Sequence, residues 1–215
     1  MSLKVNEIFY GIQGESSYAG RPCVFVRLTG CNLRCSYCDT QYAYSEGQEM
    51  EIREIINRIS SYRCNLVEIT GGEPLIQKKT PALIYGLLEG GFEVLLETNG
   101  SQDISKVDER CVRIIDIKCP SSCEEKKNDL GNLKRLTGKD EIKFVIGNRA
   151  DYEYAKKILD SMNLDSSSVN TIHFSTVFGK MHPKILAKWI LEDRLNVRLH
   201  IQLHKFIWDP EQRGV

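Results

Sequence analysis

The sequence predicts an α/β protein whose core is an incomplete, TIM-like barrel of about six parallel strands. Short apolar, β-rich runs alternate with longer amphipathic segments, which is typical of a parallel sheet with helical crossovers. Six expected strands follow a cysteine-rich loop and one precedes it, which is fewer than the eight that close a full barrel. Polar or glycine-bearing motifs come directly after several of these strands, where both barrels and open sheets bind ligands. A doubly wound flat sheet is the alternative.

The expected elements follow these runs along the chain. The strands are expected at residues 22–28, 65–70, 92–97, 112–118, 141–146, 171–175 and 197–203. The helices are expected at residues 51–62, 80–89, 150–162 and 183–195. In the second helix, Pro81 suits the first turn, and Gly90 and Gly91 supply a stop. The polar, lysine-rich stretch 121–140 is expected to be irregular chain with one short helix.

Composition and charge exclude several classes of protein. Lysine plus arginine equals aspartate plus glutamate at 29 each, so no basic field argues for nucleic acid. No apolar run approaches the ~20 residues needed to cross a bilayer. Eight cysteines without a signal peptide fit a reducing compartment better than a disulfide framework. We therefore expect a cytoplasmic protein with one domain over residues 1–215, which binds neither nucleic acid nor membrane.

Three cysteines follow the first expected strand at C-x3-C-x2-C spacing: Cys31, Cys35 and Cys38. A [4Fe–4S] cluster normally takes four thiolates, so three from one loop leave one iron free to bind a small molecule. This vacancy predicts chemistry at iron rather than electron storage alone. C-x2-C steps are also zinc-ligand spacings, so a zinc-stabilised binding module without catalysis stays open. The fourth zinc ligand would be one of the five further cysteines: Cys23, Cys64, Cys111, Cys119 and Cys123.

Four more expected strands end in polar or glycine-bearing motifs, at residues 70–74, 98–100, 118–122 and 202–205. Because the carboxyl ends of parallel strands meet at one face, we expect these motifs to lie beside the cysteine loop. Gly71 and Gly72 lack Cβ atoms, so their backbone can closely approach a ligand, and Glu73 could bind an ammonium group. Glycine and proline often serve only to turn the chain, but that role alone explains poorly why these four motifs and the cysteine loop all follow strands.

The cysteine loop GCNLRCSYCDT at residues 30–40 and the motif TGGEP at 70–74 together resemble the radical S-adenosylmethionine superfamily. The flanking segments sharpen the resemblance: EIFYGIQGE at 7–15, FVRLTGCNLRC at 25–35, KCPSS at 118–122 and QLHK at 202–205. With them, nearly the whole chain resembles the 7-carboxy-7-deazaguanine synthase family of queuosine and deazapurine biosynthesis.

The resemblance implies a fold, a reaction and partners. The fold is a shortened barrel, and the reaction converts 6-carboxy-5,6,7,8-tetrahydropterin into 7-carboxy-7-deazaguanine by radical ring contraction with loss of ammonia. The implied cofactors are a [4Fe–4S] cluster, S-adenosylmethionine used catalytically, and Mg2+. A homodimer and an electron donor of the flavodoxin or ferredoxin type are also expected.

The resemblance also assigns site residues. Cys31, Cys35 and Cys38 would hold the cluster, and Thr40 would bind Mg2+ that also contacts the substrate carboxylate. The residues expected at S-adenosylmethionine are Tyr37, Cys38, Asp39, Gly72, Asp116, Ile117, Lys118, Ser175, Thr176 and Val177. Of the segment 116–118, only Lys118 matches the Ser-Pro-Lys of many relatives by identity. The residues expected at the pterin are Ile12, Gln13, Gly14, Glu15, Arg27, Thr70 and His204.

Other interpretations stay open for some of these residues. Arg27 could equally form a surface ion pair, Thr40 could cap a turn, and His204 could be a hydrogen-bonded core residue. A glycyl-radical activase would carry the same three-cysteine loop but would dock a protein. The segment 13–15 favours a small-molecule substrate over that alternative.

Overall fold

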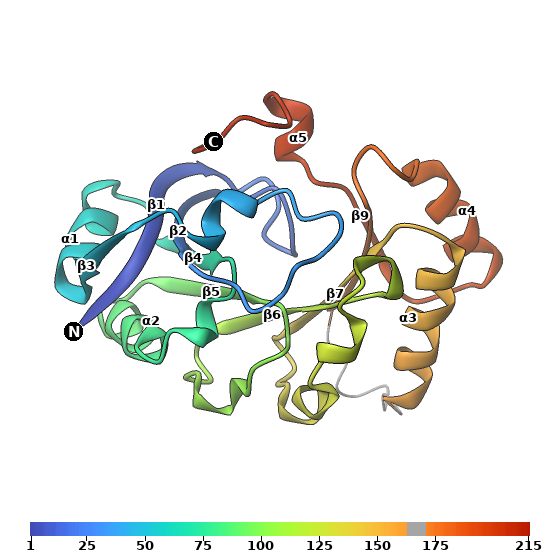
Figure 1. The fold of residues 1–215 in the computed structure, drawn as a ribbon, viewed down its shortest axis with the longest axis horizontal. Coiled ribbons are helices and arrows are strands. Elements are labelled where there is room, and N and C mark those ends of the chain that lie inside the picture. The colour runs from blue at the N-terminus through green and yellow to red at the C-terminus, as the bar shows by residue number, and fades with distance from the viewer. Residues whose placement is uncertain (163–170) are drawn as a thin grey trace.

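The computed structural model describes residues 1–162 and 171–215, in which nine strands form one sheet (Figure 1). The strands are β1 (Ser2–Ile12), β2 (Pro22–Leu28), β3 (Gln48–Glu51), β4 (Leu66–Gly71), β5 (Glu93–Thr98), β6 (Val112–Ile117), β7 (Glu141–Ile146), β8 (Thr171–Thr176) and β9 (Arg198–His200). Their order is β3-β1-β2-β4-β5-β6-β7-β8-β9, and β2 and β4 to β9 run parallel. The end strands β3 and β9 do not pair with each other, so the sheet is an open, incomplete barrel as predicted.

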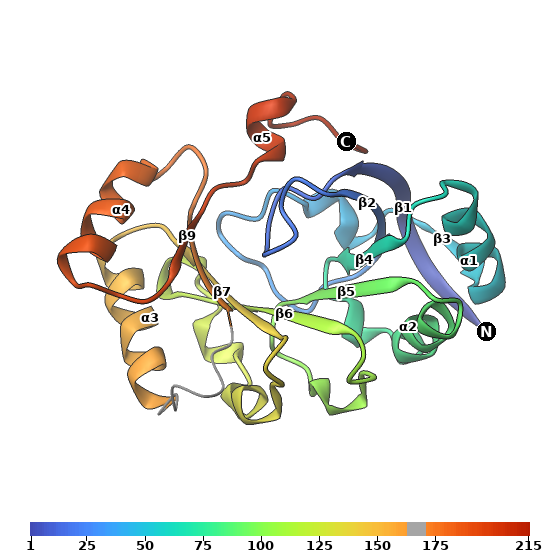
Figure 2. The same ribbon diagram turned by 180° about the vertical axis from the view of Figure 1, so that it is seen from behind.

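Four helices cover one face of this sheet: α1 (Ile52–Ser61), α2 (Thr80–Glu89), α3 (Arg149–Ser161) and α4 (Pro183–Glu192) (Figures 1 and 2). The first two pack on the apolar residues of β2, β4 and β5, and the last two on those of β6, β7 and β8. The strand residues in both clusters alternate with those of the other face, as the pleat requires. Helices on one face alone are inconsistent with the doubly wound alternative, which needs them on both.

The other face of the sheet is the inside of the barrel. On β2, β4, β5 and β6 the first inward positions are apolar, with Cys23, Phe25, Leu66, Leu95, Val112 and Ile114 packed together, whereas β7 and β8 place the buried Glu141–His173 pair there. Farther along β4 and β5 the inward positions become charged, at Glu68 and Glu97, and Lys143 of β7 lines the same cavity. The inside of the barrel is therefore sealed at one end and polar at the end where the parallel strands finish.

The structure differs from the sequence-based expectations at the edges of the sheet. Strands β1 and β3 were not predicted; β1 pairs antiparallel with β2, and β3 pairs antiparallel with β1 at the edge of the sheet. The last strand is shorter than the predicted 197–203, because β9 pairs with β8 over three residues before the chain turns into α5 (His204–Ile207). The stretch 121–140 contains three short 3-10 turns rather than one helix. No helix in the described residues has the length and apolarity that a membrane crossing requires.

Candidate active site

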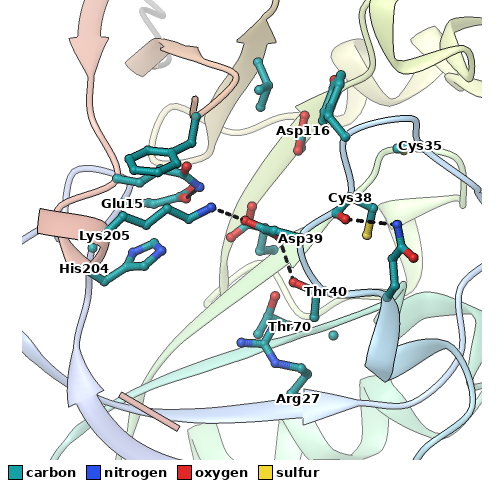
Figure 3. A pocket seen from close by; sticks show the side chains of 18 of the residues that line it. Glu15, Arg27, Cys35, Cys38, Asp39, Thr40, Thr70, Asp116, His204 and Lys205 are labelled. Carbon is teal, nitrogen blue, oxygen red and sulfur yellow. Dashed lines mark hydrogen bonds and ion pairs between the residues drawn. The ribbon is translucent and has the colours of Figure 1, made fainter. Parts of the chain in front are cut away.

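One cavity of about 830 Å³ lies at the carboxyl ends of the parallel strands. It is lined by every residue assigned from the sequence to the cluster, cofactor, metal or substrate except Ile117 and Ser175. Ile117 points into the core beneath α3, and Ser175 is buried within β8. In Figure 3 the cysteine loop, with Cys35 and Cys38, faces Glu15 and His204 across this cavity.

The cysteine loop is held by close backbone packing. A Cβ atom added to Gly72 would lie 2.2 Å from the carbonyl oxygen of Gly30 and 2.7 Å from Cβ of Cys31, so only glycine fits. The Glu73 amide donates to the Gly30 carbonyl at 2.8 Å, which joins the two motifs directly. The glycine pair therefore positions the cysteines, besides exposing backbone to the cavity at Gly72.

Glu73 itself is not available to a ligand. It is fully buried, and its carboxylate accepts hydrogen bonds from the Thr98 hydroxyl at 2.8 Å and from the amides of Asn99 at 2.6 Å and Leu75 at 2.9 Å. The interpretation that Glu73 binds an ammonium group is therefore wrong. This carboxylate instead ties the loops after β4 and β5 together.

The three thiols of the loop suit a metal cluster. Cys31, Cys35 and Cys38 are half-buried free thiols on the cavity wall. Burial raises the pKa of Cys31, and it raises that of Cys35 to about 11. The thiols of Cys31 and Cys35 therefore need bound metal to ionise near neutral pH. Among the described residues, no three His, Cys, Asp or Glu side chains gather closely enough for one metal ion. A [4Fe–4S] cluster takes one thiolate at each of several irons, so the thiols that hold it need not converge on one point.

The other five cysteines take no part in the candidate site. Cys23, Cys111 and Cys119 are fully buried, Cys64 is half-buried, and Cys123 is exposed. All five lie outside the cavity wall.

Buried polar atoms beside the cysteine loop have open hydrogen-bonding capacity. The hydroxyl of Tyr37 and the Oδ1 atom of Asp116 are buried and find no partner among the described residues. The other carboxylate oxygen of Asp116 accepts from Lys118 Nζ at 2.8 Å. Burial opposes the charge of Lys118, but Asp116 outweighs it and raises the pKa of this lysine. Unsatisfied buried polar atoms are rare, so this corner is built to receive a polar ligand.

Thr40 is linked to the far end of the chain through Asp39. The Thr40 hydroxyl donates to Oδ1 of Asp39 at 2.9 Å, and Oδ2 of Asp39 accepts from Lys205 Nζ at 2.5 Å (Figure 3). Desolvation at the cavity wall favours the neutral form of the half-exposed Asp39 carboxyl, but the Lys205 ammonium prevails and lowers its pKa. Because the hydroxyl hydrogen points to Asp39, the lone pairs of Thr40 are left for a cation.

The wall opposite the cysteines contains a buried ionic cluster that the sequence analysis missed. Lys143, only 8% exposed at its side chain, bridges Glu15 and Glu97, with a distance of 2.8 Å to Glu97 Oε1. Gln202 also donates to Glu15 at 2.7 Å. Burial disfavours the Glu15 carboxylate, but Lys143 outweighs it and holds the pKa of Glu15 well below its usual value. The signal that could have revealed this cluster is the presence of charged residues, Glu97 and Lys143, within otherwise apolar predicted strands.

Arg27 and His204 complete the cavity. Arg27 Nε donates to Glu7 at 2.7 Å while its guanidinium lines the cavity, so it is both an ion-pair partner and a site residue. His204 packs against Gly14, where an added Cβ would lie 2.1 Å from its Nδ1 atom. Burial lowers the pKa of His204, although Glu15 opposes the shift. This histidine is therefore mainly neutral near pH 7 and can both donate and accept a hydrogen bond.

The end of the chain forms one rim of the cavity. Residues 209–215 line it, and the Arg213 guanidinium lies 3.6 Å from the ring centre of Tyr42 and 3.1 Å from Glu46. Tyr42 in turn donates to Glu7 at 3.1 Å. Figures 1 and 2 show the C-terminus beside β1, on the far side of the opening from β9.

Comparisons with known proteins agree with this geometry. A family model of the radical SAM superfamily matches residues 25–178. A protein of Koribacter versatilis named 7-carboxy-7-deazaguanine synthase is 44% identical, over 99% of this chain and all of its own length. A protein of the same name from Chlorobaculum tepidum is 45% identical, over 99% of this chain and 97% of its own. The crystal structure of QueE from Escherichia coli has a similar fold, with a TM-score of 0.76, 23% identity and 95% of each chain covered.

Proposed function

Because the chain belongs to the 7-carboxy-7-deazaguanine synthase family of the radical SAM superfamily, we propose that it converts 6-carboxy-5,6,7,8-tetrahydropterin into 7-carboxy-7-deazaguanine with loss of ammonia. The observation that carries the proposal is 44–45% identity over 99% of the chain to proteins with the synthase name. A cavity lined by nearly all the expected site residues supports it. The same full-length relatives favour this reaction over that of a glycyl-radical activase.

Cys31, Cys35 and Cys38 are the residues that would hold a [4Fe–4S] cluster, and Tyr37, Gly72, Asp116 and Lys118 would surround S-adenosylmethionine. When bound and reduced by an external electron donor, the cluster and S-adenosylmethionine would supply a carbon-centred radical able to remove a hydrogen atom from an unreactive C–H bond. The chain contributes position and exclusion of water. The unpartnered hydroxyl of Tyr37 and Oδ1 of Asp116 offer hydrogen bonds to the polar parts of the cofactor. The exposed backbone at Gly72 can approach its amino-acid end without steric hindrance.

Thr40 is the residue that would bind Mg2+. Its oxygen is a hard ligand on the cavity wall, and Mg2+ commonly takes few protein ligands and completes its shell with water and substrate. The hydrogen bond to Asp39 supports this role because it turns the hydroxyl hydrogen away from the cation.

The wall formed by Gln13, Glu15, Arg27 and His204 suits a carboxylated pterin. The Glu15 carboxylate can accept from the amide and amine N–H groups of the pterin ring, and Arg27 can pair with a carboxylate. The neutral imidazole of His204 can donate to a ring atom or accept from one. Lys143 keeps Glu15 ionised, which preserves its acceptor character inside a buried site.

Anaerobic assay tests this function directly. The reconstituted protein is incubated with the carboxypterin, S-adenosylmethionine, Mg2+ and a reductant, and the product is identified by its ultraviolet spectrum and mass. We expect 7-carboxy-7-deazaguanine and ammonia in equal amounts, and none from Cys35→Ala, which cannot hold the cluster. A brown protein that cleaves S-adenosylmethionine but never consumes the pterin would refute the substrate assignment.

We also propose that the chain acts as a single-domain homodimer in the cytoplasm and receives electrons from a protein of the flavodoxin or ferredoxin type. Light scattering after gel filtration tests the dimer. Replacing the chemical reductant by a purified donor protein tests the electron source. Thr40→Ala, which should weaken the response to Mg2+ while the visible cluster spectrum is kept, tests the metal site.

A further inference from the structure

Glu68 occupies an unusual place on the inner face of β4. Its neighbours across the sheet are apolar: Phe25 on β2 and Leu95 on β5. It lies two residues before Thr70, lines the cavity, and is only 3% exposed. A carboxyl group thus lies just above the apolar layer that closes the barrel.

This carboxyl group has no cation partner in the described part of the chain. Glu15 and Glu97 share Lys143, whereas the side-chain partner of Glu68 is the Gln13 amide. A buried carboxylate without a counter-charge is costly, so the group neutralises by taking up a proton. Burial, reinforced by the charges of Glu97 and Glu15, raises the pKa of Glu68 well above its usual value, and the nearby Lys143 charge and the Gln13 hydrogen bond only partly offset this rise.

The direction of the hydrogen bond to Gln13 follows from a second contact. The Glu15 amide donates to Oε1 of Gln13 at 2.9 Å, so this atom is the amide oxygen. The Gln13 group that faces Glu68 is therefore Nε2, a donor, and Glu68 accepts through Oε2. A protonated carboxyl in this position keeps one O–H donor after accepting from Gln13.

We propose that Glu68 is a specificity-determining residue that presents an O–H donor to an acceptor atom of the bound ring. The proposal rests on the function above and names how the ring is recognised. A pterin has a carbonyl oxygen at position 4 beside its N–H groups. A protonated Glu68 supplies a donor for that oxygen, while the ionised Glu15 supplies an acceptor for the N–H groups. Glu68 and Glu15 thus bind different groups along one edge of the ring, Glu68 as a donor and Glu15 as an acceptor, because only Glu15 is paired with Lys143.

A pair of pteridines tests this recognition without radical chemistry. The probes are 6-carboxypterin, with an acceptor oxygen at position 4, and its 4-amino analogue, with a donor there. Binding of each is followed by ligand fluorescence near neutral pH. The proteins are the wild type, Glu68→Leu, Glu68→Gln and the control Glu93→Gln, which changes a carboxyl at the opposite end of neighbouring β5.

We expect the wild type and Glu93→Gln to bind 6-carboxypterin at least about tenfold more tightly than the 4-amino analogue. Glu68→Leu should lose this preference, and Glu68→Gln should restore most of the affinity for 6-carboxypterin because its amide also donates. Equal binding of the two probes by the wild type, or unchanged preference in both Glu68 variants, would overturn the role of Glu68 and leave the proposed function standing. If the wild type binds neither probe, the pterin substrate fails as well.

Discussion

Replacing Lys143 by methionine is the perturbation whose cost the structure defines best. Methionine keeps a long, unbranched side chain but removes the ammonium that joins Glu15 to Glu97. All three side chains are less than one quarter exposed, so water cannot replace the lost partner. Breaking a buried pair in this way typically costs about 3 to 5 kcal/mol. For a chain of this size the midpoint of thermal unfolding should fall by roughly 10 °C.

Thermal unfolding followed by circular dichroism under anaerobic conditions measures this cost. The matched control is Lys188→Met, because Lys188 is 71% exposed and lies 3.6 Å from Glu192 on the surface of α4. We expect the control to lose at most ~0.5 kcal/mol, as surface pairs do. Adding Glu97→Gln to Lys143→Met should recover part of the loss, because an amide needs no counter-charge.

The pH dependence gives a second measure of the same cluster. The lowered pKa of Glu15 stabilises the fold above the usual value of 4.5, and this contribution is lost as the pH falls below it. Lys143→Met should remove that acid-sensitive part of the stability. A variant that unfolds within ~1 °C of the wild type, with the same pH profile, would refute the argument that Lys143 compensates two buried carboxylates.

Three further predictions test other parts of the site. Gly72→Ala should lose iron on purification, measured by the visible spectrum, because its Cβ would lie 2.2 Å from the carbonyl oxygen of Gly30; full iron content would contradict this. The free energy of unfolding of the wild type should decline as the pH rises above about 4.5, because Glu68 ionises in the unfolded chain while the buried group stays protonated. Urea titrations at several pH values should show that Glu68→Gln lacks this part of the pH dependence. Arg213→Ala, which loses its contact with Tyr42, should change global stability by less than ~1 kcal/mol yet expose residues 209–215 to faster proteolysis. Equal cleavage rates would show that Arg213 does not hold this segment.

Much of the fold was predictable because its signals are local. The helix at 80–89 and the strands at 22–28 and 141–146 were predicted with the bounds that the structure shows. Strands β1 and β3 were missed because they are stabilised by antiparallel pairing, β1 with both β2 and β3, and strand formation depends on pairing and packing more than on a strand's own pattern. The length of β9 was overestimated for the same reason.

The sequence by itself determined the identity of the cysteine loop and the face on which the motifs meet. The spacing of Cys31, Cys35 and Cys38 and the motifs at strand ends are short-range features, and the rule for parallel strands brings them together. Only the tertiary structure decided what each charged group does. It buried Glu73 as a structural acceptor, paired Lys143 with Glu15 and Glu97, and left Glu68 without a cation. The protonation and role of a carboxyl depend on neighbours brought close by the fold from distant parts of the chain, and spacing along the sequence does not encode them.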